Sequence, residues 1–209
     1  MALLWVARFV QRHNYCWMMK KTMGMNRQKA ENKDIVLEWY NPLQEVITDE
    51  GIVPDDIRNM DETGFRIGIG KSAAIVITRR TKSHYFGIPQ NRESATAIKA
   101  ISAAGEAIPA FLILSAVSHS ARWYDPINNL KPNTRVAIAD TGYSNDQISY
   151  GWLQHYEEHS RCLQVGAKRL LLLDGHGSHH TREFIKFCDD HGIIPFGLPP
   201  NLTHLLQPL

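Results

Sequence analysis

Long apolar runs are missing from this chain of 209 residues, and cysteine is scarce. The longest apolar stretch, Ala107–Val117, is interrupted by Pro109 and Ser115, whereas a helix that spans a bilayer needs about 20 consecutive apolar residues. We therefore expect no membrane-spanning segment and no membrane partner. The three cysteines are far apart without a CxxC pair, which favours a reducing compartment over a secreted disulfide scaffold; they are Cys16, Cys162 and Cys188.

A strong excess of one charge is also missing, because the formal net charge is only +2. The charge is nevertheless uneven, since residues 1–33 hold seven Lys and Arg side chains against one acid, Glu31. A basic segment attached to a mildly acidic body is typical of contact with a polyanion, most simply nucleic acid. The alternative is a solvated basic surface. The hydrophobic content of 44% is that of an ordinary globular domain.

Hydrophobic periodicity predicts an α/β protein. The continuous apolar run Arg169–Leu173 is typical of a strand buried on both faces. The predicted order along the chain is an antiparallel meander of strands, followed by a strand–helix–strand unit. This order predicts a mixed sheet with helices on its faces. Pro199 and Pro200 predict a loop without helix over 197–209. Helices are expected at 2–19, 34–50, 145–160 and 181–191, and strands at 57–69, 73–79, 94–103, 108–115, 135–139, 169–173 and 193–197.

Two aspartates occupy positions where functional carboxylates are often found. Asp61 follows the start of one strand in NMDETGF, and Asp174 follows Arg169–Leu173 in LLLLDGHGSHH. Ligands gather at the carboxyl ends of strands in α/β sheets, and Mg²⁺ prefers oxygen ligands. Two carboxylates on neighbouring strands would form a metal site suited to phosphodiester cleavage. The alternative is that each side chain only caps a turn.

Other polar residues near these aspartates are weaker candidates. Asp140 is expected to be a turn residue, and Asp189 and Asp190 are expected to lie on a solvated helix face. Lys168 and Arg169 are equally consistent with DNA-backbone contacts and with ordinary surface charge. Four histidines could suggest zinc, but they match no HExxH pattern and have no cysteine pair beside them, so phosphate contact, a polar group at a helix start or surface exposure is preferred; they are His176, His179, His180 and His191.

Three motifs follow one another along the chain: NMDETGF at 59–65, LLDGHGSH at 172–179, and LPPN at 198–201 followed by THLLQPL at 203–209. Each motif alone is weak, but their order and separations make a specific match. Together they resemble the DDE superfamily endonuclease domain of pogo-like transposases. These transposases belong to the mariner superfamily, and the branch includes jerky-like and CENP-B-like proteins. The resemblance covers roughly residues 34–209.

The resemblance implies an RNase H-like fold, which is a mixed sheet with an antiparallel meander and parallel strands flanked by helices. It also implies that Asp61 and Asp174 are catalytic and metal-binding carboxylates, and that the cofactor is Mg²⁺ or Mn²⁺. The implied reaction is metal-dependent DNA strand cleavage and transfer at transposon ends. The implied partner is therefore DNA, and the expected location is the nucleus. The resemblance is compatible with a homodimer.

The N-terminal segment has a second similarity. Its pattern W-x-x-R-F-x-x-R-H at 5–13 resembles the closing helix of a CENP-B-type helix-turn-helix domain. Residues 1–33 are therefore interpreted as a remnant of that domain with a basic linker, and residues 34–209 as the endonuclease domain. Such basic side chains make salt-sensitive contacts to phosphates. The candidate DNA-binding residues are Arg8, Arg12, Lys20, Lys21, Arg79, Arg80, Lys82 and His176.

The third acidic residue of the family is expected directly after Gln207-Pro208-Leu209, beyond the last residue of this chain. The domain is therefore expected to be incomplete at its C-terminal end. Two carboxylates without the third would bind metal weakly and leave the geometry for in-line displacement incomplete. Strand cleavage by these residues is accordingly expected to be impaired. The alternative function is that of a domesticated DNA-binding protein without catalysis.

Overall fold

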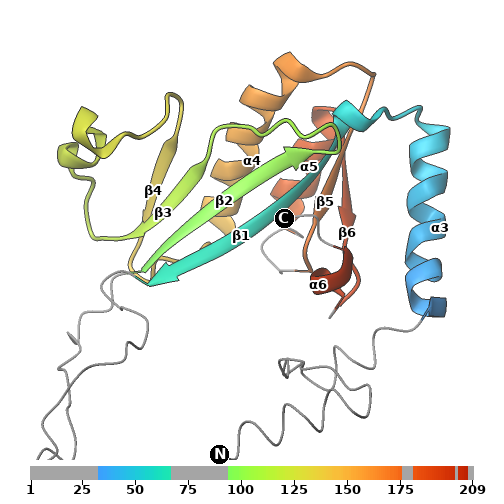
Figure 1. Ribbon diagram of the computed structural model, residues 1–209, viewed down its shortest axis with the longest axis horizontal. Helices are drawn as coiled ribbons and strands as arrows, with labels where there is room; N and C mark the ends of the chain where they lie inside the picture. The colour runs from blue at the N-terminus through green and yellow to red at the C-terminus, as the bar shows by residue number, and fades with distance from the viewer. Residues whose placement is uncertain (1–32, 67–93, 176–180, 201, 207–209) are drawn as a thin grey trace, which may run out of the picture.

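The computed structural model describes residues 33–66, 94–175, 181–200 and 202–206 (Figure 1). Its centre is one six-stranded mixed sheet with the strand order β4-β3-β2-β1-β5-β6. The strands are β1 (Ile57–Arg66), β2 (Ser94–Ser102), β3 (Phe111–Ser115), β4 (Arg135–Ala139), β5 (Arg169–Leu173) and β6 (Ile193–Gly197). The predicted strand at 73–79 lies outside the described residues.

Antiparallel and parallel pairings meet at β1, in the middle of the sheet. The strand pairs β1–β2 and β2–β3 are antiparallel, whereas β3–β4, β1–β5 and β5–β6 are parallel. This arrangement confirms the predicted mixed α/β sheet. A parallel pair needs a long crossover connection, and a helix usually provides it.

Helices supply those connections and cover the sheet. α4 (Asp146–Ser160) and α5 (Arg182–Asp190) lie together behind the sheet in Figure 1, and α3 (Lys33–Asp49) stands beside β6. The side chain of Asn145 caps α4 by accepting a hydrogen bond of 2.9 Å from Ile148 N. Short 3₁₀ turns complete the connections: η1 (Pro54–Asp56), η2 (Ala121–Tyr124), η3 (Pro126–Asn128) and η4 (Arg161–Leu163).

The prediction that residues 197–209 contain no helix was wrong. The one-turn helix α6 (Thr203–Leu206) begins three residues after Pro200. A proline removes its own N–H donor and restricts the residue before it, so it does not prevent a helical turn that begins after it. Leu206 N donates to Leu202 O at 3.0 Å and closes this turn.

Each face of the sheet has its own apolar cluster. The larger cluster joins the sheet to α4 and α5 and includes Met60, Trp152 and Leu171. The smaller cluster joins the sheet to α3 around Leu43 and Leu170. We refer to these two sides as the α4 face and the α3 face.

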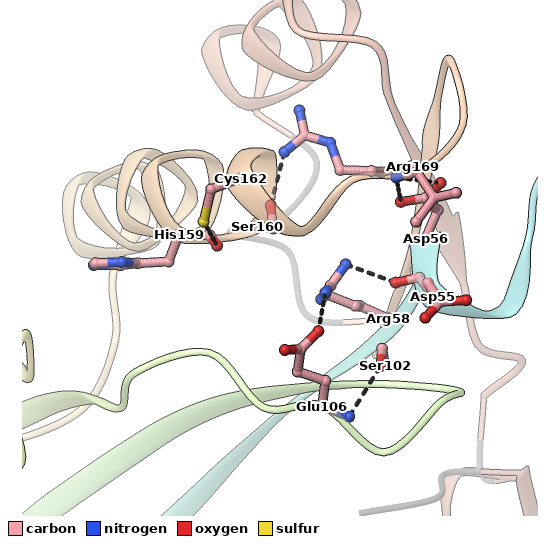
Figure 2. A network of polar contacts seen from close by, with 10 residues as sticks. Asp55, Asp56, Arg58, Ser102, Glu106, His159, Ser160, Cys162 and Arg169 are labelled. Atoms are coloured by element: carbon pink, nitrogen blue, oxygen red, sulfur yellow. Dashed lines mark hydrogen bonds and ion pairs between the residues drawn. The ribbon is translucent and has the colours of Figure 1, made fainter.

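A buried polar network stabilises the end of the sheet at which β1 and β5 begin (Figure 2). Arg58 Nη1 donates to the carbonyl oxygen of Asp55 at 2.9 Å. The Asp56 carboxylate accepts hydrogen bonds from the backbone N–H groups of Val165 and Gly166. Side chains thus tie the chain directly before β1 to the loop that leads into β5.

Within the described ranges, no helix combines the length and the apolar character needed to cross a bilayer.

Candidate metal and nucleic-acid site

Asp61 and Asp174 occupy matching positions on two adjacent parallel strands. Asn59 lies opposite Leu172 in the β1–β5 register, an offset of 113 residues. Continued by two positions, the same register places Asp61 opposite Asp174, the residue that directly follows β5. Because neighbouring strands lie about 4.8 Å apart, the two carboxylates are neighbours in space.

Both aspartates belong to the α3 face of the sheet. Ile57 and Leu172 pack in the cluster of the α3 face, and side chains alternate between faces along a strand. Asp61 therefore shares its face with Ile57, and Asp174 shares its face with Leu172. Both side chains are partly exposed, so the pair is accessible to solvent.

The neighbouring acid Glu62 is directed to the opposite face. Its Oε2 accepts a hydrogen bond of 2.9 Å from Ser144 Oγ, ahead of α4. The sheet therefore separates the two adjacent acids of the NMDETGF motif and leaves only Asp61 beside Asp174.

Backbone contacts hold the end of β5 in place. Leu198 N donates a hydrogen bond of 2.7 Å to Leu173 O, the carbonyl directly before Asp174. On the adjacent strand, Trp39 Nε1 of α3 donates to Gly197 O at 2.7 Å. Asp174 thus follows a strand end that is bonded on its β6 side.

The structure adds Lys99, which sequence reasoning missed. Lys99 of β2 lies directly opposite Asp61 in the antiparallel pair, and its side chain is exposed. Side chains directly opposite each other have Cβ atoms about 5 Å apart on one face. Lys99 and Lys131 also line a cavity of about 410 Å³. A cation therefore flanks Asp61 on the β2 side, opposite to the side on which β5 carries Asp174.

The donor set fits a hard divalent cation. Mg²⁺ binds oxygen ligands and often takes only one or two protein carboxylates, and Asp61 and Asp174 provide two from neighbouring strands. The other acids considered from the sequence lie elsewhere. Asp140 is an exposed turn residue after the edge strand β4, and Asp189 and Asp190 are exposed on α5, which covers the opposite face.

Two predicted basic contacts behave differently in the structure. Arg169, at the start of β5, is directed toward α4, where it forms an ion pair with Glu157. Because its side chain is only 1% exposed, Arg169 is not available to DNA. Lys168 is partly exposed and forms an ion pair of 2.7 Å with Glu50. The eight candidate DNA-binding residues lie outside the described residues, as do His179 and His180. Of the four histidines considered from the sequence, His191 is described, and its Nδ1 lies 2.8 Å from the carbonyl oxygen of Phe187.

Three buried groups with clearly shifted pKa values lie away from the aspartates, on the α4 face. Burial raises the pKa of Tyr156 to about 12 and that of the Cys188 thiol to about 12. Burial also lowers the pKa of His155 below its ordinary value of 6.5. These groups are therefore uncharged at neutral pH, as their places in or beside the core require.

Comparison with known sequences finds a matching family, and the relatives include two fungal proteins. The family model described as DDE superfamily endonuclease matches residues 91–209. "MFS-type transporter clz9" of Cochliobolus lunatus is 34% identical over 159 residues, which are 76% of this chain and 17% of that protein. "Chaetoglobosin A biosynthesis cluster protein C" of Chaetomium globosum is 31% identical over 85 residues, 39% of this chain and 21% of that protein.

Comparison with solved structures finds the same fold in Mos1 transposase. Its paired-end complex with the left transposon end has a TM-score of 0.53 at 10% identity, covering 96% of this chain and 52% of that chain. The Mos1 strand transfer complex has a TM-score of 0.50 at 11% identity, covering 91% and 48%. The likeness confirms the predicted RNase H-like sheet. The present chain spans about half of the Mos1 chains and less than a quarter of the two fungal relatives.

Proposed function

This chain belongs to the DDE superfamily endonucleases, and from that premise we propose that it is a transposase-derived nuclease domain that binds DNA and a divalent metal ion. The observation that carries the proposal is the matching register of Asp61 and Asp174 on adjacent parallel strands. Among the described residues, these are the acids that both the family resemblance and the sheet geometry bring together.

The proposed cofactor is Mg²⁺ or Mn²⁺, held by Asp61 and Asp174. Bound there, the metal would activate an attacking water and stabilise the leaving oxygen of a phosphodiester. The contribution of the chain is to place both carboxylates, partly exposed, side by side on the α3 face at the level where β5 ends. The apolar cluster of the α3 face packs on the preceding part of β5, through Leu170 and Leu172.

The proposed substrate is DNA. Its phosphates would meet Lys99 beside the carboxylate pair, together with the basic segment at residues 1–33. Contacts of this kind release counterions, so the affinity for DNA falls steeply as salt is raised.

Metal binding provides the first test. We expect Mn²⁺ uptake, measured by calorimetry on the folded chain, to be lost or strongly weakened in Asp61→Ala and in Asp174→Ala. Asp140→Ala is the matched control, because it removes an exposed carboxylate at the far edge of the sheet. Equal uptake by all four proteins would refute the assignment of the metal site.

Cleavage and DNA binding provide the second test. We expect the chain to bind DNA in a salt-sensitive manner. The family resemblance implies a third carboxylate directly after Gln207-Pro208-Leu209, and we expect cleavage to need it together with Asp61 and Asp174. A polypeptide that ends at Leu209 is therefore expected to cleave DNA less than one that includes an Asp and a following helix after Leu209. DNA binding that is independent of Asp61 and Asp174, without cleavage in either form, would favour the domesticated DNA-binding protein instead.

Location and assembly are further parts of the proposal. A DNA substrate supports a nuclear location, which a fluorescent fusion in fungal cells would test. The Mos1 structure is a paired-end complex. If this chain also pairs two DNA ends, a homodimer would place one nuclease domain at each end, and light scattering in the presence of DNA would test this.

A further inference from the structure

A second cluster of metal-ligating side chains lies on α4, on the opposite side of the sheet from the aspartates. His155, Glu158 and His159 stand at spacings of three and four residues, which places them on one side of the helix. Their ligand atoms all lie within 4.8 Å of one another. We propose that these three residues bind a zinc ion.

The surroundings of His155 favour this role. Its Nε2 is 2.9 Å from the carbonyl oxygen of Pro109. Because a carbonyl can only accept, Nε2 carries the proton and Nδ1 keeps its lone pair. A histidine that binds a metal usually donates its other N–H to a carbonyl or carboxylate, which fixes the tautomer and the ring orientation. The edge contact with Phe111, at 5.7 Å between ring centroids, further restrains the His155 ring.

The other two ligands are closer to solvent. The His155 and His159 rings lie 4.5 Å apart between centroids, Glu158 is exposed and His159 is partly exposed. In Figure 2 the His159 ring points away from the buried Arg58 and Arg169 side chains. A metal can therefore enter from solvent while His155 anchors it to the fold.

The donor set selects the metal. Two imidazoles and one carboxylate form the three-ligand set found in catalytic zinc sites, where the fourth position stays open. A cavity of about 430 Å³ adjoins the cluster and is lined in part by Tyr124, Asn133 and Arg135. The Arg135 guanidinium makes an anion or hydroxide the favoured fourth ligand. Zinc thus suits this site, whereas the oxygen-only pair on the α3 face suits Mg²⁺.

The test is the affinity of the full chain for Zn²⁺, measured by competition with a chromophoric chelator. We expect His159→Ala to weaken the affinity by about tenfold or more and Glu158→Gln to weaken it less. His119→Ala is the matched control, because it removes an exposed histidine outside α4. Histidines outside α4 are the same in the parent and in the two α4 variants, so the difference in affinity among these three proteins reports the α4 cluster.

Both α4 variants change exposed or partly exposed side chains, and circular dichroism verifies that they fold. Absence of Zn²⁺ binding by the parent chain, or equal affinity of the parent and His159→Ala, would overturn the proposal. So would an equal loss of affinity in His119→Ala. Because Mn²⁺ binding at Asp61 and Asp174 is measured separately, failure of the zinc site leaves the proposed nuclease function untouched.

Discussion

The Asp56 carboxylate accepts a hydrogen bond of 2.5 Å from the backbone N–H of Gly166, in the loop that leads into β5. Asp56 ends η1 directly before β1 and is fully buried. This contact joins the two parallel strands where they start, and the register that continues from it brings Asp61 to the level of Asp174.

The Asp56 contact is therefore expected to support both stability and metal binding. Asp56→Ala removes the buried carboxylate that accepts from the backbone N–H groups of Val165 and Gly166, and we expect the free energy of unfolding to fall by about 2–4 kcal/mol in urea denaturation. Asp55→Ala is the control, because Asp55 contributes only its backbone carbonyl to Arg58. A stability equal to that of the control would show that the contact is dispensable.

The two aspartates are expected to act as one unit. If they share a metal ion, Asp61→Asn removes most of the Mn²⁺ affinity and Asp174→Asn adds little in the double variant. Coupled sites commonly show interaction free energies of about 0.5–3 kcal/mol. Calorimetry on the two single variants and the double variant measures this coupling, and strictly additive losses would mean that each aspartate binds metal alone.

Lys99 is expected to have opposite effects on the two ligands. Lys99→Gln removes the positive charge beside Asp61, so we expect weaker DNA binding. The slope of the logarithm of DNA affinity against the logarithm of salt concentration is expected to decrease by about 1, the amount that one phosphate contact contributes. The same change removes a cation that competes with the metal, so Mn²⁺ affinity rises. Lys186→Gln, on the exposed surface of α5, makes the same charge change away from the site. Parallel behaviour of both variants in fluorescence anisotropy would exclude a local role for Lys99.

Alkaline pH is expected to destabilise the fold through Cys188. Burial raises the pKa of this thiol from 9.0 to about 12. Above pH 9 the unfolded chain therefore loses a proton that the folded chain retains, and stability falls as the pH rises toward 12. Tyr156 acts in the same direction from about pH 10.

Urea denaturation at pH 8, 9 and 10 tests the Cys188 prediction. In Cys188→Ala we expect a smaller decrease of the free energy of unfolding between pH 9 and pH 10. This holds even if the smaller side chain lowers the free energy of unfolding at every pH. Cys162→Ala, which removes an exposed thiol, should retain the full decline. Identical slopes in both variants would contradict the assignment.

Several elements were predictable because their signals are local. The apolar run at 169–173 is β5, and the periodicity at 34–50 and 145–160 became α3 and α4 with ends shifted by a residue. The burial of Arg169 was not predictable, because it depends on Glu157 and Ser160 of a helix that packs on the strand from elsewhere in the chain.

The candidate site divides in the same way. The motif residues Asp61 and Asp174 were recognisable from the sequence, whereas Lys99 was not, since its place depends on the pairing of β2 with β1. The α4 histidines had a local signal that was overlooked, two histidines four residues apart on a predicted helix. The contact between His155 and Pro109 required the fold.

Local sequence patterns predict most of the strands and helices, and they mark Asp61 within one strand and Asp174 directly after another. The parallel register of β1 and β5, and the shared face of Asp174 with Asp61 rather than with Glu62, are visible only in the fold. Periodicity is a property of adjacent residues and assigns side chains to alternate faces. Which strands meet, and which face receives which helix, depends on the burial of apolar surface between segments distant in the chain.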